Sequence, residues 1–331
     1  MVKHWKRLGL VTGLSLTLVA AGCGADEEGE DAGGEDDNGD AEETEEDEDD
    51  EDDDEDDDTS GEASGNYGED VEYSITGIDG GSGVVQSTED AIEDYDLDWD
   101  VQTSSDAAMI QELDNAYQDE EPIFLTGWTP HWKFQEYDLK ILDDPENSYG
   151  DAESIHSIAR EGLADDHPDA YQIIDNFQWD EADMEEVMLE IQDDVDEVEA
   201  AQNWIDGNED MVSEWTDGVD EDAGEGESIS LSLVAWDTEI ASTNVLAQVL
   251  ESVGYDVEQN QVEANYVFAS VADGDADAST AVWLPHTHAD YHEDYQEDYE
   301  DLGPNLEEGA QLGLTVPAYM DIESIEDLQE E

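Results

Sequence analysis

Basic residues are scarce in this sequence. Lys and Arg number six among 331 residues, against 100 Asp and Glu, and the formal net charge is −94 at pH 7. Proteins that bind nucleic acid neutralise its phosphates with Lys and Arg, so this composition excludes nucleic acid as a partner. Cysteine occurs once, as Cys23, which excludes an intramolecular disulfide.

Common enzyme motifs are also missing. The sequence contains no GxxxxGKS/T phosphate loop, no GxSxG nucleophile turn, no HExxH and no CxxC, and its glycine cluster does not fit GxGxxG. A hydrolase or a kinase is therefore disfavoured. We expect a protein that is not an enzyme and that needs no cofactor.

A long apolar run is missing as well. The apolar residues 8–19 follow Lys3, Lys6 and Arg7, and they are too few to span a bilayer comfortably. A basic start, a short apolar run and small residues before Cys23 are typical of an export signal. We therefore expect residues 1–23 to be a signal peptide.

Cys23 lies where bacterial lipoproteins carry the lipidated cysteine. The stretch resembles a lipobox, in which cleavage exposes the cysteine and diacylglycerol is attached to its sulfur. This resemblance predicts a protein anchored through Cys23 at the extracytoplasmic face of the cell membrane. A transmembrane anchor or a plain secretory signal is the alternative.

An acidic segment follows the predicted anchor. Of the 33 residues at 26–58, 25 are Asp or Glu and none is a large apolar residue. Such a segment has nothing to bury and repels itself, so residues 24–66 are predicted to be a disordered tether. A calcium-binding tract is the more specific alternative interpretation of this segment.

The remainder of the chain is strongly acidic too. Subtracting those 25 acidic residues from 100 leaves 75 after residue 58, where only Lys133, Lys140 and Arg160 are basic. Self-repulsion among about 72 uncompensated charges opposes a compact state, and salt screens it because the Debye length falls to about 3 Å at 1 M. The composition therefore predicts a halophilic source.

Hydrophobic patterns after the tether predict an α/β protein. Short apolar strands alternate with helical patterns, and this order implies parallel strands joined by crossover helices. The expected strands are residues 71–78, 123–126, 229–235, 257–262, 278–284 and 312–316, and the expected crossover helices are residues 88–95 and 242–253.

The pattern changes to successive amphipathic helices between residues 151 and 218. We expect helices at residues 152–163, 168–177 and 181–191. Trp179, Trp204 and Trp215 lie in or beside this region, and aromatic residues on amphipathic helices usually face the interior. They are therefore interpreted as packing residues.

Two local patterns could form a binding site. His286, His288 and His292 have the spacing H-x-H-x3-H, which could hold a transition metal. The glycine cluster at residues 77–83 ends a predicted strand and precedes a helix, so its backbone N–H groups could bind a carboxylate. A plain glycine-rich turn is the other interpretation of that cluster.

Several motifs resemble a known family. The segment GWTPHWKF at residues 127–134, followed by YDLK at 137–140 and DDP at 143–145, is similar to the glycine-betaine-binding subunits of osmoprotectant ABC importers. Further segments of residues 70–331 match the same family. They are residues 77–83, 155–156 with 159–160, 234–237 with 241–244, 274–278, 283–285 with 287–288, and 301–303.

This resemblance implies a type II periplasmic-binding-protein fold with two α/β lobes and a hinge. The usual family order places the segment beginning at Leu231 first, so the chain resembles a circularly permuted, domain-dislocated subgroup. Permutation preserves a site when the old termini are adjacent. The implied lobe I is residues 67–141 and 314–331, and lobe II is residues 142–313.

The resemblance also implies the site residues. Three tryptophans form a cage for a quaternary ammonium, which carries no N–H group and is held by cation–π attraction of about 0.5 to 2 kcal/mol per aromatic face. Matched motif by motif, the cage is Trp128, Trp236 and Trp283. The ligand carboxylate is expected at the backbone N–H groups of Gly83 and Val84 and at the His288 side chain.

The predicted function is thus that of a solute-binding protein. It would capture glycine betaine or a similar quaternary ammonium solute and deliver it to the permease and ATPase of an ABC importer for osmoprotection. A carboxylate cradle favours betaines over choline. Two alternatives stay open, a zinc-type importer component that uses the three histidines, and a surface adhesin or polyanionic cell-wall protein.

Overall fold

The computed structural model describes residues 67–330. The predicted signal peptide, Cys23 and the acidic tether lie outside the described residues. Within residues 67–330, no helix is both long enough and apolar enough to cross a membrane. These residues form one mixed sheet with strand order β2-β1-β3-β9-β5-β8-β6-β7, and β4 pairs with β9 beside this path.

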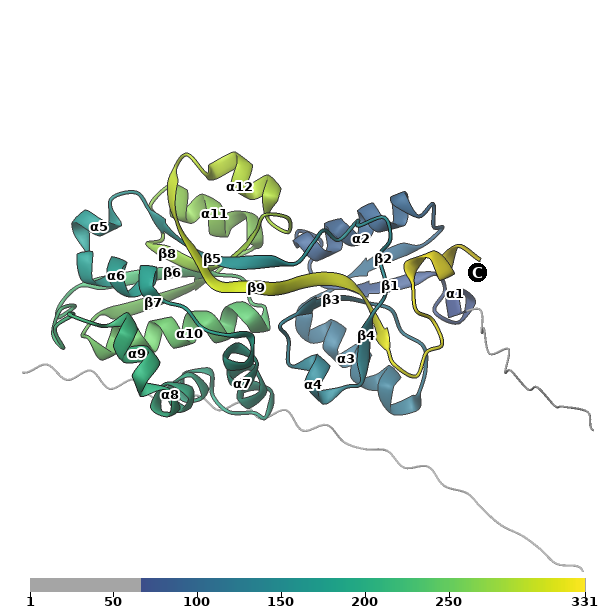
Figure 1. Ribbon diagram of the computed structural model, residues 1–331, viewed down its shortest axis with the longest axis horizontal. Helices are drawn as coiled ribbons and strands as arrows, with labels where there is room; N and C mark the ends of the chain where they lie inside the picture. Colours follow the sequence, from purple (N-terminus) through teal and green to yellow (C-terminus); the bar gives the residue numbers. More distant parts are fainter. Residues whose placement is uncertain (1–66, 331) are drawn as a thin grey trace, which may run out of the picture. The chain divides into compact units, whose positions relative to one another are not determined.

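The first half of the sheet is built on parallel strands. β1 pairs in parallel with β2 and β3, and β9 runs antiparallel to both β3 and β4. Helix α2 lies on one side of these strands and α3 with α4 on the other (Figure 1). The elements are α1 (Tyr67–Asp70), β1 (Ser74–Gly77), α2 (Gly83–Asp94), β2 (Asp100–Thr103), α3 (Asp106–Asp119), β3 (Leu125–Thr129), α4 (Lys133–Glu136) and β4 (Leu139–Ile141).

The second half combines parallel and antiparallel strands. β6 pairs in parallel with β7 and β8, whereas β5 lies antiparallel between β8 and β9. The elements are β5 (Glu153–Arg160), α5 (Leu163–Asp166), α6 (Pro168–Asn176), α7 (Glu181–Gln192), α8 (Glu197–Gly207), α9 (Glu209–Trp215), β6 (Ser228–Leu233), α10 (Asp237–Ser252), β7 (Asp256–Gln261), α11 (Ala264–Ala272), β8 (Ala278–Leu284) and α12 (Ala289–Tyr295).

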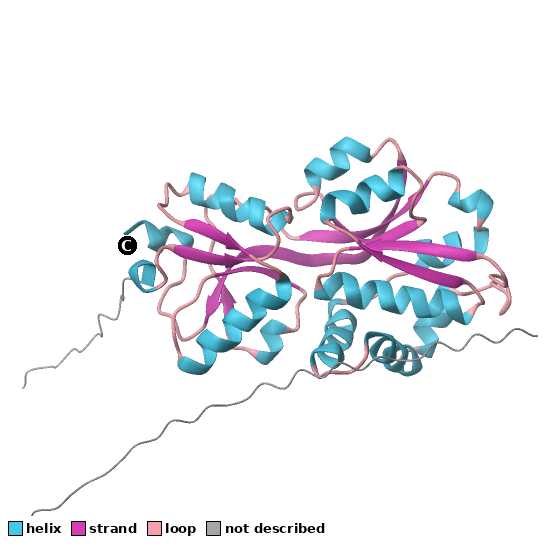
Figure 2. Cartoon of the chain, turned by 180° about the vertical axis from the view of Figure 1, so that it is seen from behind, coloured by secondary structure: helices cyan, strands magenta, loops and turns pink. Residues whose placement is uncertain are grey.

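One long strand belongs to both halves. β9 (Tyr299–Pro317) runs through the middle of the sheet, and the short helix η1 (Ile325–Glu330) follows it (Figure 2). Ala310 of β9 pairs with Glu153 of β5, and the next residue, Gln311, pairs with Thr129 of β3. The passage from one half to the other therefore lies between these two consecutive residues.

The predicted helix at residues 152–163 is wrong, because this segment forms the central strand β5. The burial of β5 alternates from Glu153 to Ser157, but Ile158 and Ala159 are then both buried. The register of β5 against β8 also shifts between His156 and Ile158. The buried Ile155 and Ile158 lie on either side of this bulge and are three positions apart in the sequence, a spacing that imitates a helix.

Most other predicted elements are confirmed with small shifts in their ends. The strand predicted at residues 278–284 is β8 with the same ends, and the glycine cluster joins β1 to α2 as expected. α2 begins at Gly83, five residues before the predicted start. The strand predicted at residues 312–316 is only the last part of β9.

Candidate functional site

A small pocket lies where the two halves of the sheet meet. All six residues predicted for ligand binding line it. They are Gly83 and Val84 at the start of α2, Trp128 on β3, Trp236 before α10, Trp283 on β8, and His288 before α12. The sequence motifs, which are spread over about 200 positions, thus converge on one place.

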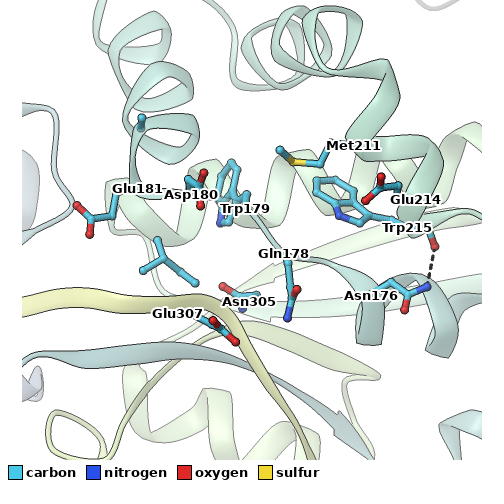
Figure 3. A pocket seen from close by; sticks show the side chains of 12 residues that line it. Asn176, Gln178, Trp179, Asp180, Glu181, Met211, Glu214, Trp215, Asn305 and Glu307 are labelled. Atoms are coloured by element: carbon cyan, nitrogen blue, oxygen red, sulfur yellow. Dashed lines mark hydrogen bonds between the residues drawn. The ribbon is translucent and has the colours of Figure 1, made fainter.

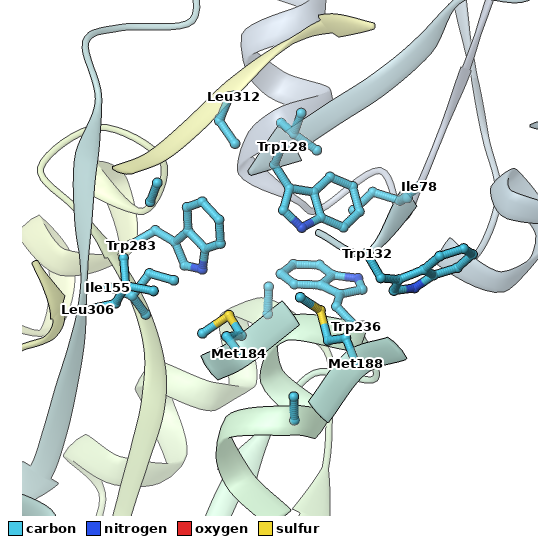
Figure 4. Packing of buried hydrophobic residues seen from close by; sticks show 14 of the residues in the cluster. Ile78, Trp128, Trp132, Ile155, Met184, Met188, Trp236, Trp283, Leu306 and Leu312 are labelled. Carbon is cyan, nitrogen blue, oxygen red and sulfur yellow. The ribbon is translucent and has the colours of Figure 1, made fainter. Parts of the chain in front are cut away.

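The three tryptophans are buried side chains that reach the pocket from different elements. Trp128, Trp236 and Trp283 are 4%, 7% and 4% exposed, and Figure 4 shows their indoles projecting toward one another. The Trp236 indole N–H donates to Asp79 Oδ2 at 3.2 Å. Asp79 follows β1, so this hydrogen bond joins the two halves beside the pocket.

Backbone N–H groups of α2 form a second wall. The first N–H groups of a helix have no intrahelical acceptor, and their partial positive charge favours an anion. Gly83 is required here, because a Cβ atom at this position would lie 2.4 Å from the Thr287 carbonyl oxygen. Beside it, Ser82 Oγ is buried without a hydrogen-bond partner among the described residues.

His288 presents a neutral N–H group to the pocket. Its Nδ1 accepts a hydrogen bond from the Trp283 backbone N–H at 3.0 Å, so the neutral ring carries its proton on Nε2. Burial lowers the pKa of His288 to about 4, and Nε2 has no partner within residues 67–330. Together with the α2 amides, this donor suits a carboxylate without adding a competing positive charge.

Glu239 also lines the pocket and was not predicted. Its side chain is 2% exposed, Trp283 Nε1 donates to Oε1 at 3.3 Å, and Thr238 Oγ1 donates to Oε2 at 2.7 Å. Burial raises the pKa of Glu239 to about 8. The one available signal is its spacing of three positions from Trp236, which places both near the same face at the start of α10.

A charged cluster lies behind Trp128. The fully buried Lys133 Nζ lies 3.7 Å from the centre of the Trp128 ring and has no hydrogen-bond partner among the described residues. Burial lowers the pKa of Lys133, whereas the nearby Asp106 and Asp237 oppose this effect. Burial and the charge of Asp237 raise the pKa of Asp106.

The cluster also connects the two halves. The Trp132 indole N–H donates to Asp237 Oδ2, and the Asp237 backbone N–H lies 3.5 Å from Asp106 Oδ2. Asp237 begins α10 in the second half, and Asp106 begins α3 in the first. These contacts and the Trp236–Asp79 hydrogen bond join the two halves beside the pocket.

The three histidines do not form a metal site. His288 Nδ1 is occupied by a backbone N–H, and His292 Nδ1 lies 2.6 Å from the Tyr299 hydroxyl group. Within residues 67–330, the one set of His and acidic groups that converges is Asp106, His131 and Asp237, where the Lys133 ammonium already supplies positive charge. The zinc-type alternative is therefore not favoured.

A larger hollow lies elsewhere on the second half (Figure 3) and includes none of the predicted site residues. Trp179 and Trp215 form part of its wall. Both are nearly buried and surround Trp204, which stacks on Trp215 at 5.9 Å between ring centroids and meets Trp179 edge-on at 5.7 Å. The prediction that these three tryptophans serve packing is confirmed.

Two solved structures resemble parts of the chain. They are lactococcal OpuAC in a closed, liganded conformation with glycine betaine, with a TM-score of 0.43 and 42% identity, and the glycine betaine/L-proline-binding protein ProX from Borrelia burgdorferi, with a TM-score of 0.43 and 32% identity. The matches cover 44% and 45% of this chain, and this chain spans 59% and 57% of theirs.

Sequence comparison covers much more of the chain. The glycine betaine/carnitine transport binding protein GbuC of Listeria monocytogenes is 53% identical over 272 residues, which are 81% of this chain and 90% of that protein. The family model for the substrate-binding domain of ABC-type glycine betaine transport systems matches residues 55–207 and 227–331. The predicted α/β fold class is confirmed by the mixed sheet and its helices, and the chain belongs to this family of substrate-binding domains.

Proposed function

We propose that the pocket captures glycine betaine, or a related betaine, for delivery to an ABC importer. The supporting observation is that Trp128, Trp236 and Trp283 line the same small pocket as the α2 amides and His288. Desolvated aromatic faces attract a quaternary ammonium by about 0.5 to 2 kcal/mol each. The amides and the neutral imidazole N–H complement a carboxylate at the other end of such a ligand.

The ligand would be held by both halves at once. Gly83, Val84 and Trp128 come from the first half, whereas Trp236, Trp283 and His288 come from the second. Contacts that exist only when the halves are together favour the closed state in proportion to their difference in free energy. The permease could then distinguish loaded protein from empty protein, and no catalytic step is part of this proposal.

The proposal includes the lobes and the anchor. Lobe I is residues 67–141 and 314–331, lobe II is residues 142–313, and the order of segments is circularly permuted relative to the commonest order in the family. The protein is tethered through residues 24–66 to lipid on Cys23 at the extracytoplasmic face of the cell membrane. Its partners there are the permease and ATPase of the importer, and its source is halophilic.

Calorimetry in molar NaCl tests the ligand. Purified protein titrated with glycine betaine, proline betaine, carnitine, choline and zinc is expected to bind the betaines most tightly, with little response to zinc. Val198→Ala is a suitable control, because Val198 is an exposed residue outside the pocket. Heat from zinc together with no heat from any betaine would refute the proposed function.

A further inference from the structure

Glu239 brings an acidic group into the wall of the proposed ammonium cage. Its Oε1 accepts the indole N–H of Trp283, a cage residue, and its Oε2 accepts the Thr238 hydroxyl group. The side chain is 2% exposed and belongs to the first turn of α10, three positions after Trp236. The carboxyl group is thus fixed at the pocket by two hydrogen bonds, away from solvent.

The charged and titratable groups around Glu239 come from several elements. Asp237 is on the same helix, Asp106 begins α3, Lys133 begins α4, and His288 precedes α12. Lys133 has Asp106 and Asp237 as its charge partners, and His288 is neutral above a pH of about 4. None of these groups therefore supplies an unpaired positive charge to Glu239 when no ligand is bound.

Burial without a cation disfavours the ionised carboxylate, and the nearby negative charge of Asp106 adds to this effect. The resulting pKa of about 8 keeps Glu239 mainly protonated at neutral pH. A quaternary ammonium head changes this balance, because it brings a positive charge that no hydrogen bond can satisfy. An adjacent carboxylate satisfies it by Coulomb attraction, which is strong in a pocket that excludes water.

We propose that Glu239 is a further ligand-binding residue, whose carboxyl group loses its proton when a quaternary ammonium enters the cage and then serves as the counter-charge of that cation. The proposal rests on the proposed function of the same pocket. One proton leaves Glu239 for the buffer, and one positive charge takes its place. The two hydrogen bonds to the carboxyl oxygens remain possible in the ionised state.

Proton release is measurable by calorimetry. Glycine betaine is titrated into the protein near neutral pH in molar NaCl, once in phosphate and once in Tris, which differ in their heats of ionisation. The observed binding heat is expected to differ between the two buffers by an amount that corresponds to release of a large fraction of one proton. Binding with the same heat in both buffers would overturn the proposal.

Two ligands isolate the charge. The tert-butylacetate anion has the shape and carboxylate of glycine betaine but no positive charge, so its binding should release no proton. Choline has the cationic head without the carboxylate, so its binding should release one. If choline releases a proton while no betaine binds, the role of Glu239 stands and the proposed betaine specificity fails. If binding of tert-butylacetate releases as many protons per site as binding of glycine betaine, the proposed role of Glu239 is wrong.

Glu239→Gln keeps the shape of the side chain and removes its ionisation. This variant should bind glycine betaine at least five times more weakly than wild type at slightly alkaline pH, with no buffer-dependent heat. Glu153→Gln is the matched control, since Glu153 is also buried and accepts hydrogen bonds from the 286–287 backbone but does not line the pocket. The assignment would be refuted if proton release persisted in Glu239→Gln. It would also be refuted if proton release were lost in Glu153→Gln as well as in Glu239→Gln.

Discussion

The ammonium nitrogen of Lys133 lies 3.7 Å from the centre of the Trp128 ring. Trp128 therefore already has a cation on one face, within the protein, while it also lines the ligand pocket. Lys133 is fully buried, and its negative partners are Asp106 and Asp237. The rear of the cage is thus an ion cluster rather than a purely apolar core.

Removal of the Lys133 charge should destabilise the protein. Lys133→Met leaves Asp106 buried beside Asp237 without a positive partner, and breaking a buried pair in this way costs about 3 kcal/mol or more. Thermal unfolding in molar NaCl measures the loss. Lys140→Met is the control, because Lys140 pairs with the exposed Glu323 and such pairs contribute less than about 1 kcal/mol. Equal losses in the two variants would contradict the prediction.

Two tryptophans should separate affinity from stability. Trp283→Ala removes one wall of the cage and should weaken betaine binding about five- to thirtyfold, equivalent to about 1 to 2 kcal/mol. Trp204→Ala instead opens a hole between Trp179 and Trp215 and should lower stability by about 3 kcal/mol or more. Affinity and melting temperature are measured for both variants in one high-salt buffer. If Trp283→Ala binds betaine with normal affinity while a stable Trp204→Ala binds it weakly, the cage has been assigned to the wrong tryptophans.

The ionisation of Glu239 should also appear in the stability of the empty protein. Burial raises the pKa of Glu239 from 4.5 to about 8, so the folded state binds more protons than the unfolded state between these values. Its contribution to stability is complete below pH 4.5 and is lost as pH rises to about 8. Glu239→Gln should therefore gain in melting temperature relative to wild type as pH rises across this window. A difference that is constant with pH would contradict this sign.

Salt should strengthen both folding and binding. Asp and Glu crowd both halves, and their repulsion acts over about 10 Å at 0.1 M salt but only about 3 Å at 1 M. Melting temperature and betaine affinity are expected to rise together as NaCl increases from 0.1 M to molar concentrations. Sucrose at matched osmolality serves as the control, because it does not screen charge. A melting temperature independent of NaCl would argue against charge repulsion as the dominant effect.

The anchor is tested at Cys23. In the native host, mass spectrometry should find Cys23 as the first residue of the mature protein, with lipid on its sulfur. Cys23→Ser should release the protein from the membrane fraction without changing betaine affinity, because the pocket is built from residues after 77. An intact or unlipidated Cys23 in the host would remove the proposed anchor.

The sequence predicted where the site lies, but it did not predict the charged or titratable residues in and behind the pocket. Trp128, Trp236 and Trp283 each lie in a specific local motif, so the residues around each one are enough to identify it. Glu239 could not be identified in this way, because its spacing of three positions from Trp236 does not distinguish it from the other acidic residues, 100 in all, until its burial is known. The same limit applies to Lys133, whose position within a recognised motif did not reveal its contact with Trp128.

Local sequence patterns also predicted some strands of the fold and missed others. β8 was predicted with its observed ends because seven consecutive buried residues form a clear strand pattern. β5 was missed because its buried isoleucines, Ile155 and Ile158, are three positions apart in the sequence, and only the bulge at residues 156–158 makes this spacing compatible with a strand. The length of β9 was missed because its first part contains polar and glycine residues, whose pairing with β5 depends on distant parts of the chain. Local patterns do not encode such pairings.

The position of β9 affects the order in which the chain can assemble. It is the last strand in the sequence, and it lies between β3 and β5 at the centre of the sheet. A nascent chain that ends before Tyr299 has β1 to β8 but lacks the strand on which β3, β4 and β5 pair. Neither half can therefore complete its sheet until β9 has been synthesised, which delays stable folding.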